Sequence, residues 1–365
     1  MKLNEIIKVL EQFAPLQLQE SYDNAGLITG NPEMEIRAAL LTLDSTEEVI
    51  DEAISSNCNL IIAHHPIIFN GLKKINGKNY VERTIIKAIK NDIAIYAAHT
   101  NLDNVRAGVN KVIADKLGLI NTKILFPKKN LLKKLFTFVP GEHAELVRNA
   151  MFSAGAGHIG NYSECSFNNE GFGTFNAGVG SNPYVGKHGI RHREEEIKIE
   201  VLIPMWKERQ IIKALFDSHP YEEVAYDVVP LDNSFSDVGS GLIGELPVAL
   251  DEISFLQHIK KNMQAPMIRH TKFLDKKISR VAICGGAGSI LLNEAIGNEA
   301  QAFISSDYKY HQFFDADGRL LICDIGHYES EQFTPLIFAQ LLNENLPTFA
   351  TLFSKTNSNP IKYFH

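Results

Sequence analysis

Four short segments, spread over most of the 365 residues, contain side chains that can bind two metal ions at one site. Their metal-type residues are the adjacent His64 and His65, then His99 and Asp103, then Asp307 and His311, and finally His327 and Glu331. Imidazole and carboxylate ligands suit zinc, manganese or ferrous iron, and the lack of a neighbouring thiolate disfavours a structural zinc site. The leading prediction is therefore a metal-dependent catalyst rather than a passive binding module.

Each segment follows an apolar run that we interpret as a buried strand. The runs and the candidate residues that follow them are Leu60–Ala63 with His64, Ile93–Ala98 with His99, Ala302–Ile304 with Ser305, and Leu320–Ile325 with His327. Ligand sites in open parallel α/β sheets form beyond the carboxyl ends of the strands. We therefore expect the candidate side chains to meet at one edge of a sheet.

The neighbouring histidines His64 and His65 place a condition on this site. Successive residues of a strand point to opposite faces, so both rings can enter one cavity only where the strand stops. Pro66 follows them and favours such a stop, because its ring restricts the backbone.

Glu331 stands four residues after His327, near the start of a predicted helix over Glu329–Asn343. Side chains at this spacing share one face of a helix. A two-metal centre usually needs a bridging carboxylate, and two divalent ions would be only half neutralised by Asp103 and Glu331. The remaining positive charge predicts an anionic substrate, with phosphate as the obvious class.

Several neighbouring residues allow more than one interpretation. His99 can bind metal, orient Asp103 or donate an ordinary hydrogen bond, and we favour an orienting or substrate-contacting role. Asp307, Lys309 and His311 can be catalytic or phosphate-binding, or can form a plain polar loop. The glycines of segment 285–289 can cradle phosphate, but a tight strand-to-helix turn fits better because the full motif is absent.

The order of predicted elements indicates the fold class. Strands and helices alternate in the first and last thirds of the chain, which predicts a layered α/β fold with a largely parallel sheet. The middle third is rich in glycine and reads β-α-β, then β-α-β, as in a ferredoxin-like insert. We expect a discontinuous α/β domain over 1–128 and 233–365, with an inserted α+β domain over 129–232.

The bulk composition is that of a globular protein, with 45% hydrophobic and 22% charged residues. The net charge of −7 argues weakly against nucleic-acid or membrane binding without excluding nucleic acid. Four widely spaced cysteines suit a reducing compartment. The beginning of the chain has no signal-peptide pattern and no run reaches membrane-spanning length, so we expect a cytoplasmic location and no membrane partner.

The motifs resemble those of the NIF-three-like family, commonly named GTP cyclohydrolase 1 type 2 homologues, over almost the whole chain. The matching segments are Asp23–Leu27, His64–Phe69 with Gly71–Lys73, His99–Asp103 and Gly326–Glu331. By this resemblance His64, His65, Asp103, His327 and Glu331 match the ligands of two metal ions, with Glu331 in the bridging position.

The resemblance also implies an assembly and an insert. Family members form toroidal homohexamers, and longer bacterial members carry a central domain similar to PII-like and CutA-type trimerising domains. The segment His219–Glu222 resembles part of that domain. One departure is Ser306, which stands where many members have glycine.

Two functions follow as hypotheses. The first is a metal-dependent hydrolase of a nucleotide or other phosphorylated small molecule, with GTP as the substrate that the resemblance implies. Water would then open the guanine ring at C8 with release of formate, and His99 or His311 would move protons. The alternative is a metal-binding hexameric regulatory or interaction protein whose insert binds an effector or partner.

Overall fold

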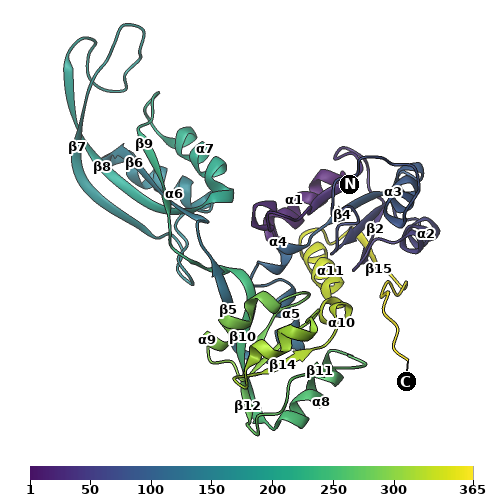
Figure 1. Ribbon diagram of the computed structural model, residues 1–365. Coiled ribbons are helices and arrows are strands. Elements are labelled where there is room, and N and C mark those ends of the chain that lie inside the picture. The colour runs from purple at the N-terminus through teal and green to yellow at the C-terminus, as the bar shows by residue number, and fades with distance from the viewer. Residues whose placement is uncertain (365) are drawn as a thin grey trace. The chain divides into compact units, whose positions relative to one another are not determined.

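The structure is a computed structural model that describes residues 1–364, and its elements are labelled in Figure 1. The chain divides into two compact units, one formed by residues 1–127 with 237–365 and one formed by residues 128–236. Within residues 1–364, no helix combines the length and the apolar character needed to cross a bilayer.

The larger unit contains two sheets, where the sequence predicted one. The first sheet has the order β1 (Gly26–Thr29), β4 (Ala94–Ala97), β3 (Leu60–Ala63), β2 (Ala38–Thr42) and β15 (Ala350–Phe353). Its last four strands are parallel, and β1 pairs antiparallel with β4. Figure 1 shows β15 beside β2, so the beginning and the end of the chain share this sheet.

Both faces of the first sheet are buried at β2, β3 and β4, as their continuous apolar runs predict. One face packs against α2 (Glu47–Ser55) and α3 (Tyr80–Lys90). The other packs against α1 (Leu3–Phe13) and α11 (Thr334–Asn345) in a core that also includes side chains of the second sheet. Every residue of β2 and β3 is buried, which fixes the positions at which the two strands end.

The second sheet has the order β11 (Arg269–His270), β14 (Leu321–Asp324), β13 (Ala302–Ser305), β12 (Ile278–Ile283), β10 (Phe235–Leu250) and β5 (Ile120–Lys128). Its central strands β12, β13 and β14 are parallel, whereas β10 is antiparallel to β12 and β11 is antiparallel to β14. Packed around it are α5 (Val109–Lys116), α8 (Glu252–Asn262), α9 (Leu292–Gly297) and the 3-10 helices η4 (Ser289–Leu291) and η5 (Tyr310–Ala316).

Short elements connect these layers. They are η1 (Leu16–Leu18), α4 (Thr100–Asp103) and α10 (His327–Glu331). The predicted helix Glu329–Asn343 is wrong in its extent, because the chain forms α10 first and begins α11 only at Thr334. Pro335, in the first turn of α11, is compatible with a new helix start and disfavours continuation of α10.

The smaller unit is an antiparallel sheet with two helices. Its elements are β6 (Leu132–Pro140), η2 (Gly141–His143), α6 (Ala144–Ser153), β7 (Ser166–Asn176), β8 (Arg191–Pro204), η3 (Met205–Lys207), α7 (Glu208–Ser218) and β9 (Tyr226–Leu231). The strand order is β7-β8-β6-β9, and the chain order is the βαββαβ of ferredoxin-like motifs. Leu135, Val147 and Ile211 belong to its separate core.

Candidate metal site

The predicted metal-type residues lie together in the larger unit. Among residues 1–364, three groups of ligand atoms lie within 4.8 Å of one another: His64, His65 and His99; His65, His327 and Glu331; and His64, Asp103 and Glu331. They follow strands of both sheets, at the carboxyl ends of β3, β4 and β14. The candidate side chains therefore follow strand ends as predicted, but they come from two sheets and not from one edge of a single sheet.

Glu331 belongs to two of these groups, one through each carboxylate oxygen. Its Oε2 lies 3.0 Å from His65 Nε2 and 3.1 Å from His327 Nε2. Its Oε1 lies 3.7 Å from His64 Nε2, which is also 3.6 Å from Asp103 Oδ1. One oxygen of Glu331 thus lies toward each ligand group, so both groups share this carboxylate.

His64 and His65 enter the same site because β3 stops before them. The strand ends at Ala63, and the backbone N–H groups of both histidines donate to the Leu43 carbonyl, at 3.1 and 3.0 Å. Their ring centroids lie 4.8 Å apart. The condition set by the alternation of strand side chains is therefore met.

All four histidines of the site use Nδ1 for an orienting hydrogen bond. The partners are the Ala98 carbonyl for His64 at 2.8 Å, Asp44 for His65 at 2.7 Å, Asp307 for His327 at 2.6 Å and Asp23 for His99 at 2.7 Å. An Nδ1–H donated to an acceptor leaves Nε2 with its lone pair for a metal. This orientation leaves each Nε2 available to a metal ion or to another partner.

Two atoms in the site have unmet bonding capacity. His64 Nε2 and Asp103 Oδ1 are buried and have no hydrogen-bond partner. Burial and the nearby Glu331 carboxylate raise the pKa of Asp103 to about 8. A buried nitrogen lone pair facing a buried carboxylate calls for a cation between them, so the donor set fits a metal ion.

The pKa values of His65 and His327 also indicate that the site favours a bound positive charge. Burial lowers the pKa of each ring, but Asp44 and Glu331 raise the pKa of His65 to about 10. The charge of Glu331 and the hydrogen bond to Asp307 likewise raise the pKa of His327 to about 11. The surrounding carboxylates therefore favour positive charge here, which protons or metal ions can supply.

Comparison with known proteins places the chain in a family. The family Duf34/NIF3 (NGG1p interacting factor 3) matches residues 1–360. The chain belongs to the DUF34/NIF3 family. The resemblance stated from the motifs is thereby confirmed.

Individual relatives agree with this membership over most of their length. The "GTP cyclohydrolase 1 type 2 homolog" of Bacillus subtilis is 37% identical over 98% of both chains, and that of Halalkalibacterium halodurans is 42% identical over 88% of this chain and 87% of its own. The crystal structure of a Bacillus cereus protein related to NIF3 has a TM-score of 0.88 at 41% identity, covering 100% of this chain and 99% of the other.

His99 occupies a defined place in this DUF34/NIF3 protein. Its ring lies 5.3 Å from the rings of both His64 and His65. Asp23 holds Nδ1 and also accepts from the Thr100 backbone N–H at 3.0 Å. Burial acts to raise the pKa of Asp23, but the hydrogen bonds from His99 and Thr100 outweigh it and lower the pKa to about 2.

In the segment after β13, Asp307 contacts the candidate metal site and His311 does not. Asp307 bonds to His327 and so belongs to the site. His311 is exposed on η5, where its ring contacts Tyr310 and Phe314, and it belongs to none of the ligand groups among residues 1–364. The backbone N–H of Lys309 donates to Gln312 within the same segment.

The glycine loop after β12 is a tight turn packed against Glu331. Its amides are already engaged, since Gly285 donates to Asn110 and Gly286 to Ser330. A Cβ on Gly286 would lie 2.4 Å from Glu331 Oε1, and the φ of +64° also favours glycine. These contacts favour the strand-to-helix turn over a phosphate cradle.

Ser306, which replaces the common glycine of the family pattern, is buried in the same region. Its hydroxyl donates to the Gly286 carbonyl at 2.6 Å. The extra side chain thus supports the glycine loop.

The sequence did not assign the carboxylates behind the histidines. Asp44 lies two residues after the end of β2, and His64 lies directly after the end of β3. A carboxylate close to a predicted strand end was therefore the signal that could have identified Asp44. Asp23 lies before β1, where no periodic pattern connects it with His99. Asp23, Asp44 and Asp307 add negative charge to the site. The charge balance predicted from the sequence set the two ions against Asp103 and Glu331 alone. The positive charge predicted to attract an anion is correspondingly smaller.

Proposed function

We propose that this protein is a metal-dependent hydrolase with a dinuclear site, acting on a nucleotide or another phosphorylated small molecule. The observation that supports it most is the position of Glu331, with one oxygen toward His65 and His327 and the other toward His64. One ion would use the group of His65, His327 and Glu331, and the other the group of His64, Asp103 and Glu331.

The residues around the ions have separate roles in this proposal. Zinc, manganese or iron at such a site polarises the substrate and lowers the pKa of water. Asp44 and Asp307 hold the rings of His65 and His327 by their Nδ1 atoms. This orientation keeps both Nε2 atoms directed at Glu331 before any ion or substrate binds.

His99 is the proposed proton carrier. Asp23 accepts the hydrogen bond from Nδ1, which leaves Nε2 able to take and return a proton. The ring lies beside His64 and His65 without being paired to Glu331, so it can face the reacting molecule. A catalytic role of His311 stays a prediction, because its ring contacts are on exposed η5.

The nucleotide part of the proposal rests on the printed name of the relatives, "GTP cyclohydrolase 1 type 2 homolog". In such a reaction one water adds at C8 of guanine and opens the ring to a formamide, and a second water hydrolyses that formamide with release of formate. The site offers the components that a hydrolysis needs: positions for ions that activate water, and His99 to move protons.

The test is formate release from GTP by protein loaded with manganese or zinc, with metal content measured on the same samples. Glu331→Gln removes the bridging charge, and Glu329→Gln removes a buried carboxylate from the same short helix outside the ligand groups. We expect formate from the wild type and from Glu329→Gln and none from Glu331→Gln. Metal-loaded wild type that turns over neither GTP nor any phosphate ester contradicts the proposal.

A second candidate is a metal-binding homohexameric regulatory or interaction protein whose insert binds an effector. The cavity in residues 128–236 described below favours it, since that cavity lies apart from the ligand residues in the sequence. Binding of a ligand to that unit, in metal-loaded hexamers without turnover, would favour this candidate. Light scattering gives the assembly state in the same samples.

A further inference from the structure

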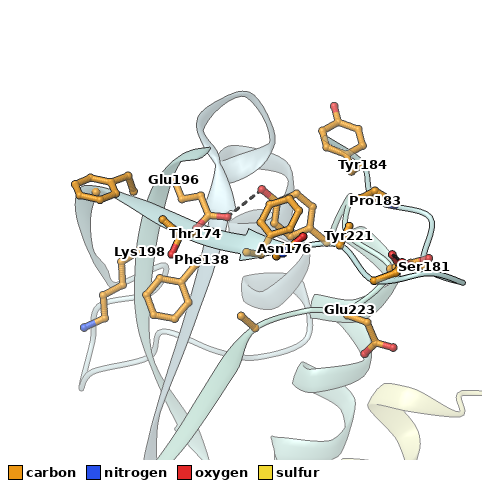
Figure 2. A pocket seen from close by; sticks show the side chains of 18 of the residues that line it. Phe138, Thr174, Asn176, Ser181, Pro183, Tyr184, Glu196, Lys198, Tyr221 and Glu223 are labelled. Atoms are coloured by element: carbon orange, nitrogen blue, oxygen red, sulfur yellow. Dashed lines mark hydrogen bonds between the residues drawn. The ribbon is translucent and has the colours of Figure 1, made fainter. Parts of the chain in front are cut away.

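The unit formed by residues 128–236 contains a cavity of about 710 Å³, drawn in Figure 2. Its walls come from β6, β7 and β8, from the segment that follows β7, and from the turn that follows α7. This volume lies in the range of pockets that bind small molecules. All its lining residues belong to this one unit.

Aromatic rings form much of the wall. Phe138, Phe172, Phe175, Tyr184 and Tyr221 all line the cavity. The rings of Tyr184 and Tyr221 have centroids 6.1 Å apart, and Figure 2 shows Phe138 and Tyr221 on the same wall as Glu196. Faces of aromatic rings attract cations through their quadrupole.

Glu196 is held in this wall by a chain of hydrogen bonds. The Tyr221 hydroxyl donates to Glu196 Oε1 at 2.9 Å, and the Tyr221 backbone N–H donates to His219 Nδ1 at 3.0 Å. His219 in turn donates from Nε2 to the Phe138 carbonyl at 3.0 Å. Burial and the bond to Glu196 raise the pKa of Tyr221, so its hydroxyl remains a donor. The segment His219–Tyr221 therefore fixes both an aromatic ring and a carboxylate.

The charged side chains that line the cavity favour a positively charged ligand over a negatively charged one. Four carboxylates line the cavity: Glu170, Glu196, Glu222 and Glu223. Lys198 is the one lysine or arginine among the lining residues, and its Nζ is bonded to Glu200 at 2.8 Å and lies over the Phe136 ring. The Arg193 guanidinium lies over the Phe172 ring, 3.8 Å from its centroid, so that ring already has a cation partner. An anion would thus meet mainly carboxylates, whereas a cation would meet carboxylates and ring faces.

A bare metal ion fits less well than an organic cation. Among residues 1–364, the clusters able to hold a metal ion include none of these glutamates. Aromatic rings and carboxylates together recognise ammonium groups that carry apolar substituents.

We propose that this cavity binds a small organic cation, an ammonium compound with an apolar body, between the aromatic rings and Glu196. The ammonium group lies near Glu196 and the Tyr221 ring, and the apolar body fills the space toward Phe138. The proposal is independent of the metal site and of any hydrolase activity.

Isothermal titration calorimetry of the full chain with benzyltrimethylammonium and with spermidine tests this, with benzoate and benzyl alcohol as anionic and neutral controls. We expect saturable binding of at least one cation and none of benzoate. Glu196→Gln keeps the shape and an acceptor for Tyr221, and we expect it to weaken binding roughly tenfold. Tyr221→Phe keeps the ring, so the expected loss is about threefold.

The matched control is Glu145→Gln, which removes the same charge from α6 outside the cavity and leaves binding unchanged. Circular dichroism shows whether each variant is folded. If Glu196→Gln does not fold, the test relies on Tyr221→Phe. Failure of both cations to bind at concentrations up to about 10 mM, above the millimolar range of weak ligands, overturns the proposal. Equal binding of benzoate, or equal losses in Glu145→Gln and Glu196→Gln, overturns it as well.

Discussion

The candidate metal site and the cavity of residues 128–236 both depend on a glutamate, but the neighbours of that glutamate differ. Glu331 is buried among imidazole rings whose Nε2 atoms face its two oxygens. Glu196 is bonded to a tyrosine hydroxyl beside phenylalanine and tyrosine rings. Imidazoles supply lone pairs for a metal ion, whereas ring faces attract an ammonium group. The same side chain is thus suited to different cations by what surrounds it.

The two regions also differ in how firmly the carboxylate is placed. Glu331 stands on a helix packed against the glycine loop, while Glu196 lies on a partly exposed strand. The proposed metal binding therefore relies on a carboxylate positioned by backbone contacts, and the proposed binding in the cavity relies on one positioned by side-chain hydrogen bonds. Each prediction below changes one of these features and leaves the other region as an internal control.

The largest expected effect is the pH dependence of metal binding. The pKa values of about 10 for His65 and 11 for His327 lie above the ordinary 6.5, so metal ions must displace protons from both rings. Metal affinity should then rise with pH, by roughly 10,000-fold between pH 7 and 9, since each of the two displaced protons contributes about tenfold per pH unit. Competition with a chelating dye at a series of pH values measures this.

The stability of the metal-free protein should change in the opposite direction. A raised folded-state pKa stabilises the protein fully below about 6.5, and this contribution is lost as pH rises through 10 to 11. Binding of benzyltrimethylammonium, whose charge is permanent, provides the comparison in the same pH range. Metal affinity that does not change between pH 7 and 9 contradicts the protonation of these rings.

A smaller effect is expected from Gly286→Ala, which places a Cβ against the Glu331 carboxylate. The contact of 2.4 Å must be relieved by moving Glu331, and we expect metal affinity to fall by up to roughly 100-fold. Gly118→Ala is the matched control, because its φ of +66° is nearly the same and no atom lies within 4 Å of the added Cβ.

Both alanine variants should lose about 1 kcal/mol of unfolding free energy from the left-handed backbone. Only Gly286→Ala should lose metal, and neither should lose binding of the organic cation. Calorimetry of unfolding and of metal binding separates the two effects. Equal metal affinities in the two variants would show that the glycine loop does not position Glu331.

Asp307→Asn and Asp44→Asn, each made as a single substitution, should reduce metal affinity by roughly 10- to 100-fold. Each aspartate accepts the Nδ1–H of a histidine ligand, and asparagine weakens that bond while keeping its size. Asp51→Asn is the control, because Asp51 pairs with Lys87 on the surface. Dye competition at one pH measures all three, and unchanged affinity in both site variants would remove the orienting role.

The strand ends could be predicted from the sequence because their cause is local. The apolar run Leu60–Ala63 is fully buried and ends before His64, as the pattern indicates. The α/β character is confirmed, but the single sheet was wrong. A run of apolar residues shows that a strand is buried and does not show which strands pair, and that choice depends on contacts distant in sequence.

For single side chains of the site, too, contacts close in sequence were predictable and contacts distant in sequence were not. The spacing of His327 and Glu331 predicted a shared face, and the two atoms lie 3.1 Å apart. The pairing of Asp23 with His99 joins residues 76 positions apart, and no periodicity reveals it. The cavity of residues 128–236 was likewise not predictable, because its rings come from several strands and loops.

The most direct test of the central claim, a carboxylate shared by two metal ions, is electron paramagnetic resonance of the manganese-loaded protein. Ions bridged by Glu331 would lie roughly 3.5–4 Å apart. The account predicts two manganese ions per chain with an exchange-coupled spectrum in the wild type and in Glu329→Gln, and loss of the coupling in Glu331→Gln. A single ion per chain, or two ions with the spectrum of isolated manganese in the wild type, would contradict it.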